Sequence, residues 1–261
     1  MDRAGFLAQY AVIRHAEGRG SDDPAYYRAL PFRDVTGRNA DQWRIRAHSY
    51  LCFERSLLRP EEKLARRPLR ILDLGAGNGW MSNRLTQRGH RAVALDIFID
   101  RLDGLGAIHH YETPIPGVAA EFDRLPFCDA AFDLVIFNSS LHYSPDYRRT
   151  LTEARRCLRP AGQLVILDSP VYKAAEHGER MRAERQACFE KTYGFRSDAL
   201  GSIEYLDERT LDALAGELGI TWSRYQAWYG WRWALRPWRA KLRGQRPPSR
   251  FVILAGRFQG R

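Results

Sequence analysis

The chain has 261 residues, of which 44% are hydrophobic, and this length and composition predict one soluble domain with a substantial core. Its apolar runs are strand-sized, well short of the roughly 20 residues of a membrane span, and its first residues lack the apolar core of a signal peptide. The four cysteines form no C-x-x-C pair, so we expect reduced thiols, no metal site and a cytoplasmic protein.

Positive charge is concentrated at one end of the chain. The formal net charge is +10, from 41 Lys and Arg against 31 Asp and Glu, and the last acidic residue is Glu217. The whole excess therefore lies beyond Glu217, together with five of the seven tryptophans. This distribution predicts a local basic and aromatic surface on a chain that is otherwise balanced in charge.

Residues 1–65 are expected to form an N-terminal helical cap. Aromatic residues recur at helical spacing over 41–58, which predicts a helix there and a charged linker after it. Arg46 and Tyr50 share one face of this helix, and an arginine beside a tyrosine hydroxyl suits a carboxylate ligand. The alternative is a solvated arginine beside a core tyrosine. An earlier polar and aromatic cluster would either line an acceptor site or cap the sheet: Arg14, His15, Glu17, Tyr26 and Tyr27.

Strand and helix patterns alternate over residues 66–170, which predicts an α/β fold with a parallel sheet covered by helices on both faces. The expected strands lie at 69–72, 92–95, 134–137 and 163–167, with helices at 80–88 and 146–158. Residues 171–204 are polar and favour helix, as expected of an insertion over a substrate site. The last segment, 205–261, is expected to hold a helix at 208–218 and strands at 220–225 and 251–255.

The segment 70–80, RILDLGAGNGW, joins a β-run to three glycines at alternate positions. A strand that ends in a glycine-rich turn and opens into a helix is a nucleotide-binding element. Asp96 ends the next β-run, 21 residues after Gly75, where a carboxylate can accept hydrogen bonds from both hydroxyls of a ribose. A dinucleotide fingerprint would need a glycine where Trp80 stands, which argues against a nicotinamide-dependent oxidoreductase.

Three segments carry a resemblance to a known family. The run D-x-G-x-G-x-G, which begins at Asp73, resembles the first motif of the class I S-adenosylmethionine (SAM) dependent methyltransferases. Residues 121–143, EFDRLPFCDAAFDLVIFNSSLHY, and 156–168, RCLRPAGQLVILD, are similar to two later segments of small-molecule members, including those of quinone biosynthesis. The resemblance implies a Rossmann-like, doubly wound sheet of seven strands, mostly parallel with one antiparallel strand. It also implies SAM as the cofactor and S-adenosyl-L-homocysteine as its product.

The resemblance assigns several cofactor contacts to the ends of the first two strands. Asp73 would orient the amino group of SAM, directly or through water. Asp96 would hold the ribose and Ile97 would pack on the adenine face. The backbone of the glycine loop would approach the methionine part: Gly75, Ala76 and Gly77.

Further contacts are implied beside the later strands. The family usually has an acidic and then a small residue before L-P-F, with the acid accepting from the adenine amino group. This chain has Glu121 and Phe122 there, with Asp123 next, and the adenine partner stays open between Glu121 and Asp123. Asn138, at the end of the fourth strand, would lie beside the sulfonium.

His142 and Tyr143 follow the fourth strand and are the candidate catalytic residues. The ordinary pKa of histidine suits a base near neutrality, and the alternative is that His142 shapes the loop. The expected reaction is methyl transfer to a small-molecule or lipid-like acceptor, on oxygen in preference to nitrogen or carbon. The alternatives are a SAM-binding partner protein without catalysis and a methyltransferase acting on RNA or another anionic macromolecule.

The basic segment WRWALRPWRAKLR, residues 231–243, has an apolar stripe beside a row of arginines. Pro237 argues against one straight helix unless a second helix begins there. Three interpretations are open: cover for the core with a solvated basic face, contact with a membrane surface or a lipid-like acceptor through Trp231–Arg250, and binding of an anionic acceptor. Nucleic acid belongs to the last interpretation and is the less favoured partner.

Overall fold

The computed structural model describes residues 3–196 and 201–259, so the parts of the predicted segments at 1–2, 197–200 and 260–261 lie outside it. Its main sheet has seven strands in the order β3-β2-β1-β4-β5-β9-β8. Only β9 runs antiparallel to its neighbours, which confirms the expected mostly parallel sheet with one antiparallel strand. The strands are β1 (Arg70–Leu74), β2 (Arg91–Asp96), β3 (Gly117–Ala119), β4 (Phe132–Asn138), β5 (Leu158–Leu167), β8 (Ile220–Tyr225) and β9 (Ile253–Phe258).

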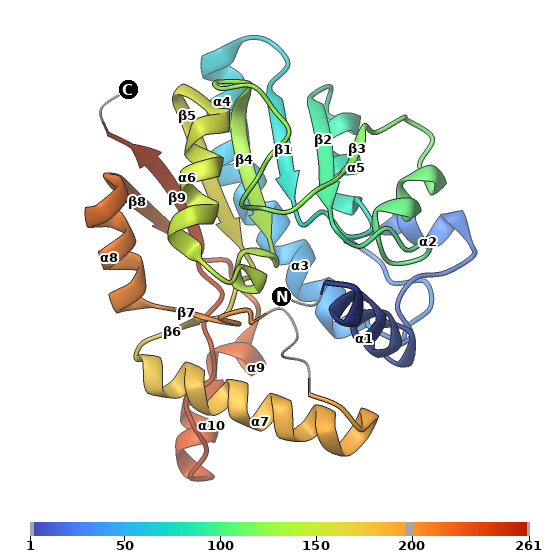
Figure 1. Cartoon of the computed structure of the whole chain (residues 1–261), viewed down its shortest axis with the longest axis vertical. Helices are drawn as coiled ribbons and strands as arrows, with labels where there is room; N and C mark the ends of the chain where they lie inside the picture. The colour runs from blue at the N-terminus through green and yellow to red at the C-terminus, as the bar shows by residue number, and fades with distance from the viewer. Residues whose placement is uncertain (1–2, 197–200, 260–261) are drawn as a thin grey trace.

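Alternate residues of the central strands point to opposite faces and bury them under different helices. Ile71 and Ile136 join one apolar cluster with α3 and α5, whereas Leu72 and Val135 join a second cluster with α6 and α8. The result is a three-layer α/β arrangement (Figure 1). The covering helices are α3 (Ala40–Phe53), α5 (Trp80–Gln87), α6 (Tyr147–Cys157) and α8 (Glu208–Leu218).

Local signals placed both ends of α8 correctly. Asp207 caps α8 by accepting a hydrogen bond from the backbone N–H of Thr210 at 2.9 Å, and Gly219 ends it at a φ of 64°. The predicted helix over 41–58 is α3 followed by a π-helical turn, Glu54–Leu58. The charged segment expected to be a linker is instead the helix α4 (Arg59–Ala65), because Pro60 is tolerated in the first turn of a helix.

Three short strands had no usable signal in the sequence. The strand β3 has three residues and no apolar run, and it was expected to be loop. The short strands β6 (Val171–Tyr172) and β7 (Leu206–Asp207) pair with each other in a separate sheet. Such short strands are defined by their partners rather than by their own residues.

Four more helices gather beyond the carboxyl ends of the parallel strands. Figure 1 shows the long helix α7 (Ala175–Tyr193) crossing this side of the molecule, with α1 (Arg3–Ala16) near one end and α9 (Trp231–Ala234) and α10 (Arg236–Leu242) beside it. The break at Leu235 fits Pro237, which stands in the first turn of α10. Among the described residues, no helix combines the length and apolarity needed to cross a bilayer.

The basic tryptophan segment does not cover the core as one interpretation held. Trp231 is 74% exposed, Trp238 62% and Leu242 67%, whereas Trp233 and Arg236 are partly buried. The segment therefore has an outward apolar and basic side and an inward side.

Candidate functional site

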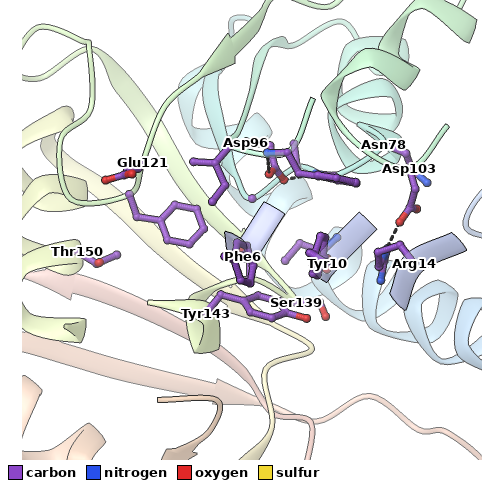
Figure 2. A pocket seen from close by; sticks show the side chains of 18 of the residues that line it. Phe6, Tyr10, Arg14, Asn78, Asp96, Asp103, Glu121, Ser139, Tyr143 and Thr150 are labelled. Carbon is purple, nitrogen blue, oxygen red and sulfur yellow. Dashed lines mark hydrogen bonds and ion pairs between the residues drawn. The ribbon is translucent and has the colours of Figure 1, made fainter. Parts of the chain in front are cut away.

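The loops after β1, β2 and β4 converge on a cavity with an empty volume of about 1160 Å³ including its mouth. This is the site that parallel α/β sheets offer at the carboxyl ends of their strands. We call it the cofactor cavity. In Figure 2, Asp96 lies on one side of it and Phe6, Tyr10 and Tyr143 lie on the other. Its lining includes these predicted residues: Arg46, Gly75, Ala76, Gly77, Asp96, Ile97, Glu121, Phe122, Asp123, Asn138 and Tyr143.

The glycine loop is shaped by close backbone approach. Gly75 has a φ of +73°, and a Cβ on it would lie 2.3 Å from the Cβ of Ser140, so no larger residue fits. A Cβ on Gly77 would meet nothing closer than the backbone oxygen of Asp103 at 3.8 Å. The loop is therefore closed on the protein side at Gly75 and open at Gly77, which leaves its backbone accessible to a ligand.

Asp96 lies at the end of β2 and is held by backbone donors. Its Oδ2 accepts from the N–H of Gly77 at 2.7 Å and its Oδ1 from the N–H of Phe98 at 2.8 Å. Burial raises the pKa of Asp96, although these backbone hydrogen bonds oppose the shift. Each oxygen keeps a lone pair, so the carboxylate can still accept from the hydroxyls of a ribose.

Asp73 lies behind the loop and does not line the cofactor cavity. Its Oδ2 accepts from the Ser82 hydroxyl at 2.7 Å, whereas its buried Oδ1 has no hydrogen-bond partner among the described residues. Burial raises the pKa of Asp73 to about 7. Of the two predicted ways to reach the amino group of SAM, this placement fits the one through water.

The far end of the cofactor cavity combines apolar and acidic side chains. Phe122 packs edge-to-face on Phe137 with ring centroids 5.6 Å apart, and Ile97 lines the same cavity. Glu121 and Asp123 both reach the lining, and Asp123 pairs with Arg149 at 3.1 Å. The structure thus brings both candidate adenine partners to the cavity.

The side chains of Arg46 and Tyr50 lie in different places, although the two residues are four positions apart on α3. Arg46 lines the cofactor cavity. Tyr50 does not reach it, because its ring is buried against Trp80 and Phe53, with centroids 5.9 and 6.4 Å away. Burial raises the pKa of Tyr50 to about 12, so the pairing predicted for these two residues is wrong for the tyrosine.

The helix α1 closes one side of the cofactor cavity, which sequence reasoning missed. Phe6, Tyr10 and Arg14 project from it into the lining. Arg14 forms an ion pair with Asp103, and the Tyr10 ring meets Tyr143 edge-on at 6.1 Å. Arg14 stood out in the sequence, but its partner is 89 positions away and has no local signal.

A second cavity, which we call the acceptor cavity, adjoins the first under α7 and α9. The two cavities share five lining residues: Tyr10, Arg14, Arg46, Ser139 and Tyr143. The acceptor cavity has an empty volume of about 1170 Å³ and is otherwise lined by Ile13, Glu17, Arg19, Gln42, Ile45, Asp168, Arg185, Phe189, Trp233, Arg236 and Phe251. Arg14 and Glu17 of the early polar cluster are here, whereas Tyr26 and Tyr27 belong to the core.

The two candidate catalytic residues lie in different surroundings. Tyr143 lines both cavities. His142 lines neither, and its buried ring approaches the Ser169 hydroxyl through Nδ1 at 3.3 Å. Burial and the nearby Arg185 and Arg46 lower the pKa of His142 to about 3. This placement favours the loop-shaping alternative over a base.

The chain's own residues fit SAM. The buried Oδ1 of Asn138 has no hydrogen-bond partner among the described residues, Gly77 leaves backbone open, and Asp96 offers a carboxylate at the expected place. Over the same residues, no group of three or more His, Cys, Asp or Glu is arranged to hold a metal ion.

Comparison with known proteins places these features in a family. A family model described as a methyltransferase domain matches residues 72–166. A demethylmenaquinone methyltransferase of Thermus thermophilus is 32% identical over 152 residues, which are 56% of this chain and 67% of that protein. A malonyl-[acyl-carrier protein] O-methyltransferase of Erwinia billingiae is 34% identical over 97 residues, 37% of this chain but only 38% of the relative's length.

Solved structures agree on the fold. The Burkholderia thailandensis 1,6-didemethyltoxoflavin-N1-methyltransferase, solved with its namesake compound and S-adenosylhomocysteine bound, aligns with a TM-score of 0.51. The alignment covers 92% of each chain at 17% identity. At this identity the similarity shows that the two proteins share a fold, and it says nothing about the acceptor.

Proposed function

Because this chain belongs to the class I SAM-dependent methyltransferases, with SAM as its cofactor, we propose that it methylates an oxygen atom of a small molecule bound in the acceptor cavity. The observation that carries the proposal is the meeting of the two cavities at Arg46, Ser139 and Tyr143. An acceptor and a methyl donor held in adjoining spaces react without a diffusional step, and such alignment is worth roughly 7–11 kcal/mol of barrier.

The cofactor supplies a methyl group on a sulfonium when it is bound. Asp96 would hold its ribose and the Gly77 backbone its methionine part. Ile97 and Phe122 would flank its adenine. The helix α1, anchored by the Arg14–Asp103 ion pair, covers the cavity and would exclude water from it.

A hydroxyl acceptor must lose its proton, and Asp168 is the residue best placed to take it. Asp168 lines the acceptor cavity at the end of β5, and the Ser139 N–H donates to the adjacent Leu167 oxygen at 2.8 Å. Its Oδ1 accepts from the Ser49 hydroxyl, and its buried Oδ2 has no hydrogen-bond partner among the described residues. A carboxylate oriented through one oxygen, with no hydrogen bond to the other, keeps a lone pair for a proton and can act as a base.

The same residue favours oxygen as the methylated atom. Burial raises the pKa of Asp168 to about 6, so it is ionised at neutral pH and is a better base than an ordinary carboxylate. The name of one relative, the malonyl-[acyl-carrier protein] O-methyltransferase, agrees with oxygen as the methylated atom. The sequence pointed to His142 as the candidate base instead, because residues 156–168 were assigned to a family segment and to the strand at 163–167, with no separate role for Asp168.

The test is transfer of label from methyl-tritiated SAM into a cell extract that is split into aqueous, organic and macromolecular fractions. Label in a low-molecular-weight product with a methyl ether or ester, shown by mass spectrometry and NMR, is the expected result. Label confined to protein or RNA would contradict the proposal, and so would an N- or C-methylated product. An Asp96→Ala variant controls for transfer that does not depend on the cofactor cavity.

We also propose that α9 and α10 rest on an anionic membrane surface. Trp231, Trp238 and Leu242 are each more than half exposed, and Arg232 and Arg239 are exposed beside them. Exposed tryptophans next to arginines suit the interface of a bilayer that carries anionic lipids. Such contact would deliver an amphipathic acceptor close to the inward side of α9, where Trp233 lines the acceptor cavity.

A further inference from the structure

The acceptor cavity has an unusual excess of positive charge. Its lining holds five arginines and two carboxylates: Arg14, Arg19, Arg46, Arg185 and Arg236 against Glu17 and Asp168. Arginine is always protonated in proteins, and a partly enclosed cavity screens charge less than bulk water does. A ligand that enters this space therefore meets a positive field.

Three of these arginines are paired within the protein. Arg14 forms an ion pair with Asp103, which lies outside the acceptor cavity. Arg19 donates to Glu17 at 2.7 Å, and Arg185 lies 3.4 Å from the carboxylate of Glu204. Their charges are largely compensated, so they do not by themselves call for a ligand.

Arg46 and Arg236 are different, since neither forms an ion pair with a carboxylate among the described residues, although Asp168 and Asp103 lie near enough to Arg46 to oppose the lowering of its pKa. Arg46 lies over the Trp43 ring at 4.9 Å, and burial and the nearby Arg19 and Arg14 lower its pKa. Arg236 lies over the Trp233 ring and donates to the Ser249 backbone oxygen at 2.8 Å. The Nε of Arg236 is buried and has no hydrogen-bond partner among residues 3–196 and 201–259.

A guanidinium that stacks on an aromatic ring and keeps N–H donors without partners can bind an anionic group. Its planar fork matches the two oxygens of a carboxylate or a phosphate. Burying such a charge without a partner is unfavourable, and an anion in the cavity removes that cost. Apolar rings complete the wall: Phe189, Trp233 and Phe251.

We propose that the acceptor is an organic anion whose carboxylate or phosphate group is bound by Arg46 and Arg236, with its apolar body against Phe189, Trp233 and Phe251. This rests on the proposed methyltransferase function. Arg46 also lines the cofactor cavity and could serve the carboxylate of SAM, whereas Arg236 lines only the acceptor cavity of the two. Arg236 is therefore the residue that tests the acceptor alone.

The first experiment uses the charge of the unidentified acceptor. A cell extract is passed over a strong anion-exchange resin at neutral pH, and the flow-through and the salt eluate are each assayed with methyl-tritiated SAM and the full chain. We expect transfer with the desalted eluate and none with the flow-through. Transfer with the flow-through alone overturns the anionic acceptor and leaves the methyltransferase proposal standing, whereas no transfer with either fraction contradicts both.

The second experiment uses matched variants and defined probes. Arg236→Gln should lower kcat/KM for the eluted acceptor by at least tenfold and leave the KM for SAM unchanged. Arg209→Gln, exposed on α8 and outside both cavities, should change neither. The S-adenosylhomocysteine-bound protein should be thermally stabilised by benzoate or phenyl phosphate more than by neutral benzamide, and Arg236→Gln should remove the difference. Equal effects of acid and amide on the wild type overturn the proposal.

Discussion

Asp168→Asn is the change that tests the chemistry of the proposed reaction most directly. The amide keeps the size of the side chain and can still accept from Ser49, but it cannot take a proton. Loss of a positioned base typically costs about 10²–10⁴ in rate. We expect kcat to fall by this factor in initial-rate assays with the eluted acceptor, while calorimetry shows unchanged affinity for SAM.

The pH profile gives the same prediction a second readout. Only the ionised carboxylate of Asp168 accepts a proton, and burial raises its pKa to about 6. A group of this pKa is about one-tenth ionised at pH 5 and about nine-tenths at pH 7, so kcat should rise about tenfold between these values. The Asp168→Asn variant should lack this limb.

Ser49→Ala is the matched control for the rise of kcat with pH, which we call the acid limb of the pH profile. The Ser49 hydroxyl donates to Asp168 and so favours its ionised form, and its loss should move the limb to higher pH while the plateau rate survives. If Asp168→Asn keeps the wild-type limb, or keeps kcat within about threefold against the expected loss of at least about 10², Asp168 is not the base. Tyr143, which lines both cavities, would then be the next residue to change.

Three further predictions concern the affinity for SAM, the attachment of α1 over the cofactor cavity, and binding to membranes. Asp96→Ala should weaken SAM binding about tenfold or more in calorimetry, because the ribose hydroxyls lose their acceptor, and equal affinities of this variant and the exposed-site control Asp22→Ala would remove Asp96 from the site. Asp103→Asn should release α1, with faster hydrogen exchange over residues 3–16 and a higher KM for SAM; unchanged exchange would show that the ion pair does not hold the cover. Wild-type protein should co-sediment with anionic vesicles at low salt and a Trp231→Ser/Trp238→Ser variant should not, and a wild type that stays in the supernatant refutes the membrane contact.

The parts of the fold that sequence reasoning predicted are those fixed by local patterns. The glycine run from Gly75, the carboxylate at Asp96 and the cap at Asp207 depend on residues a few positions apart or on the ends of strongly apolar strands. Parallel strands bring their carboxyl ends to one edge of a sheet, so a prediction of strand ends was also a prediction of the cofactor cavity.

The acceptor side could not be predicted in the same way, because long-range contacts decide it. Asp168 and Ser49 are 119 positions apart and Arg14 and Asp103 are 89 apart, so neither pair leaves a pattern along the chain. For Tyr50, a local pattern was present but gave the wrong position. Helical spacing placed it with Arg46, but burial of its ring against Trp80 turned it into a core residue.

The helix α10 could serve two of the three interpretations of the basic segment, the membrane surface and the anionic acceptor. Arg236 and Trp238 are two residues apart, which is about 200° around a helix, so they must face opposite ways. Arg236 accordingly lines the acceptor cavity while Trp238 is 62% exposed. An anionic acceptor and a membrane surface are thus compatible partners of one short helix, and substitutions at Arg236 and at the exposed tryptophans should separate acceptor use from vesicle binding.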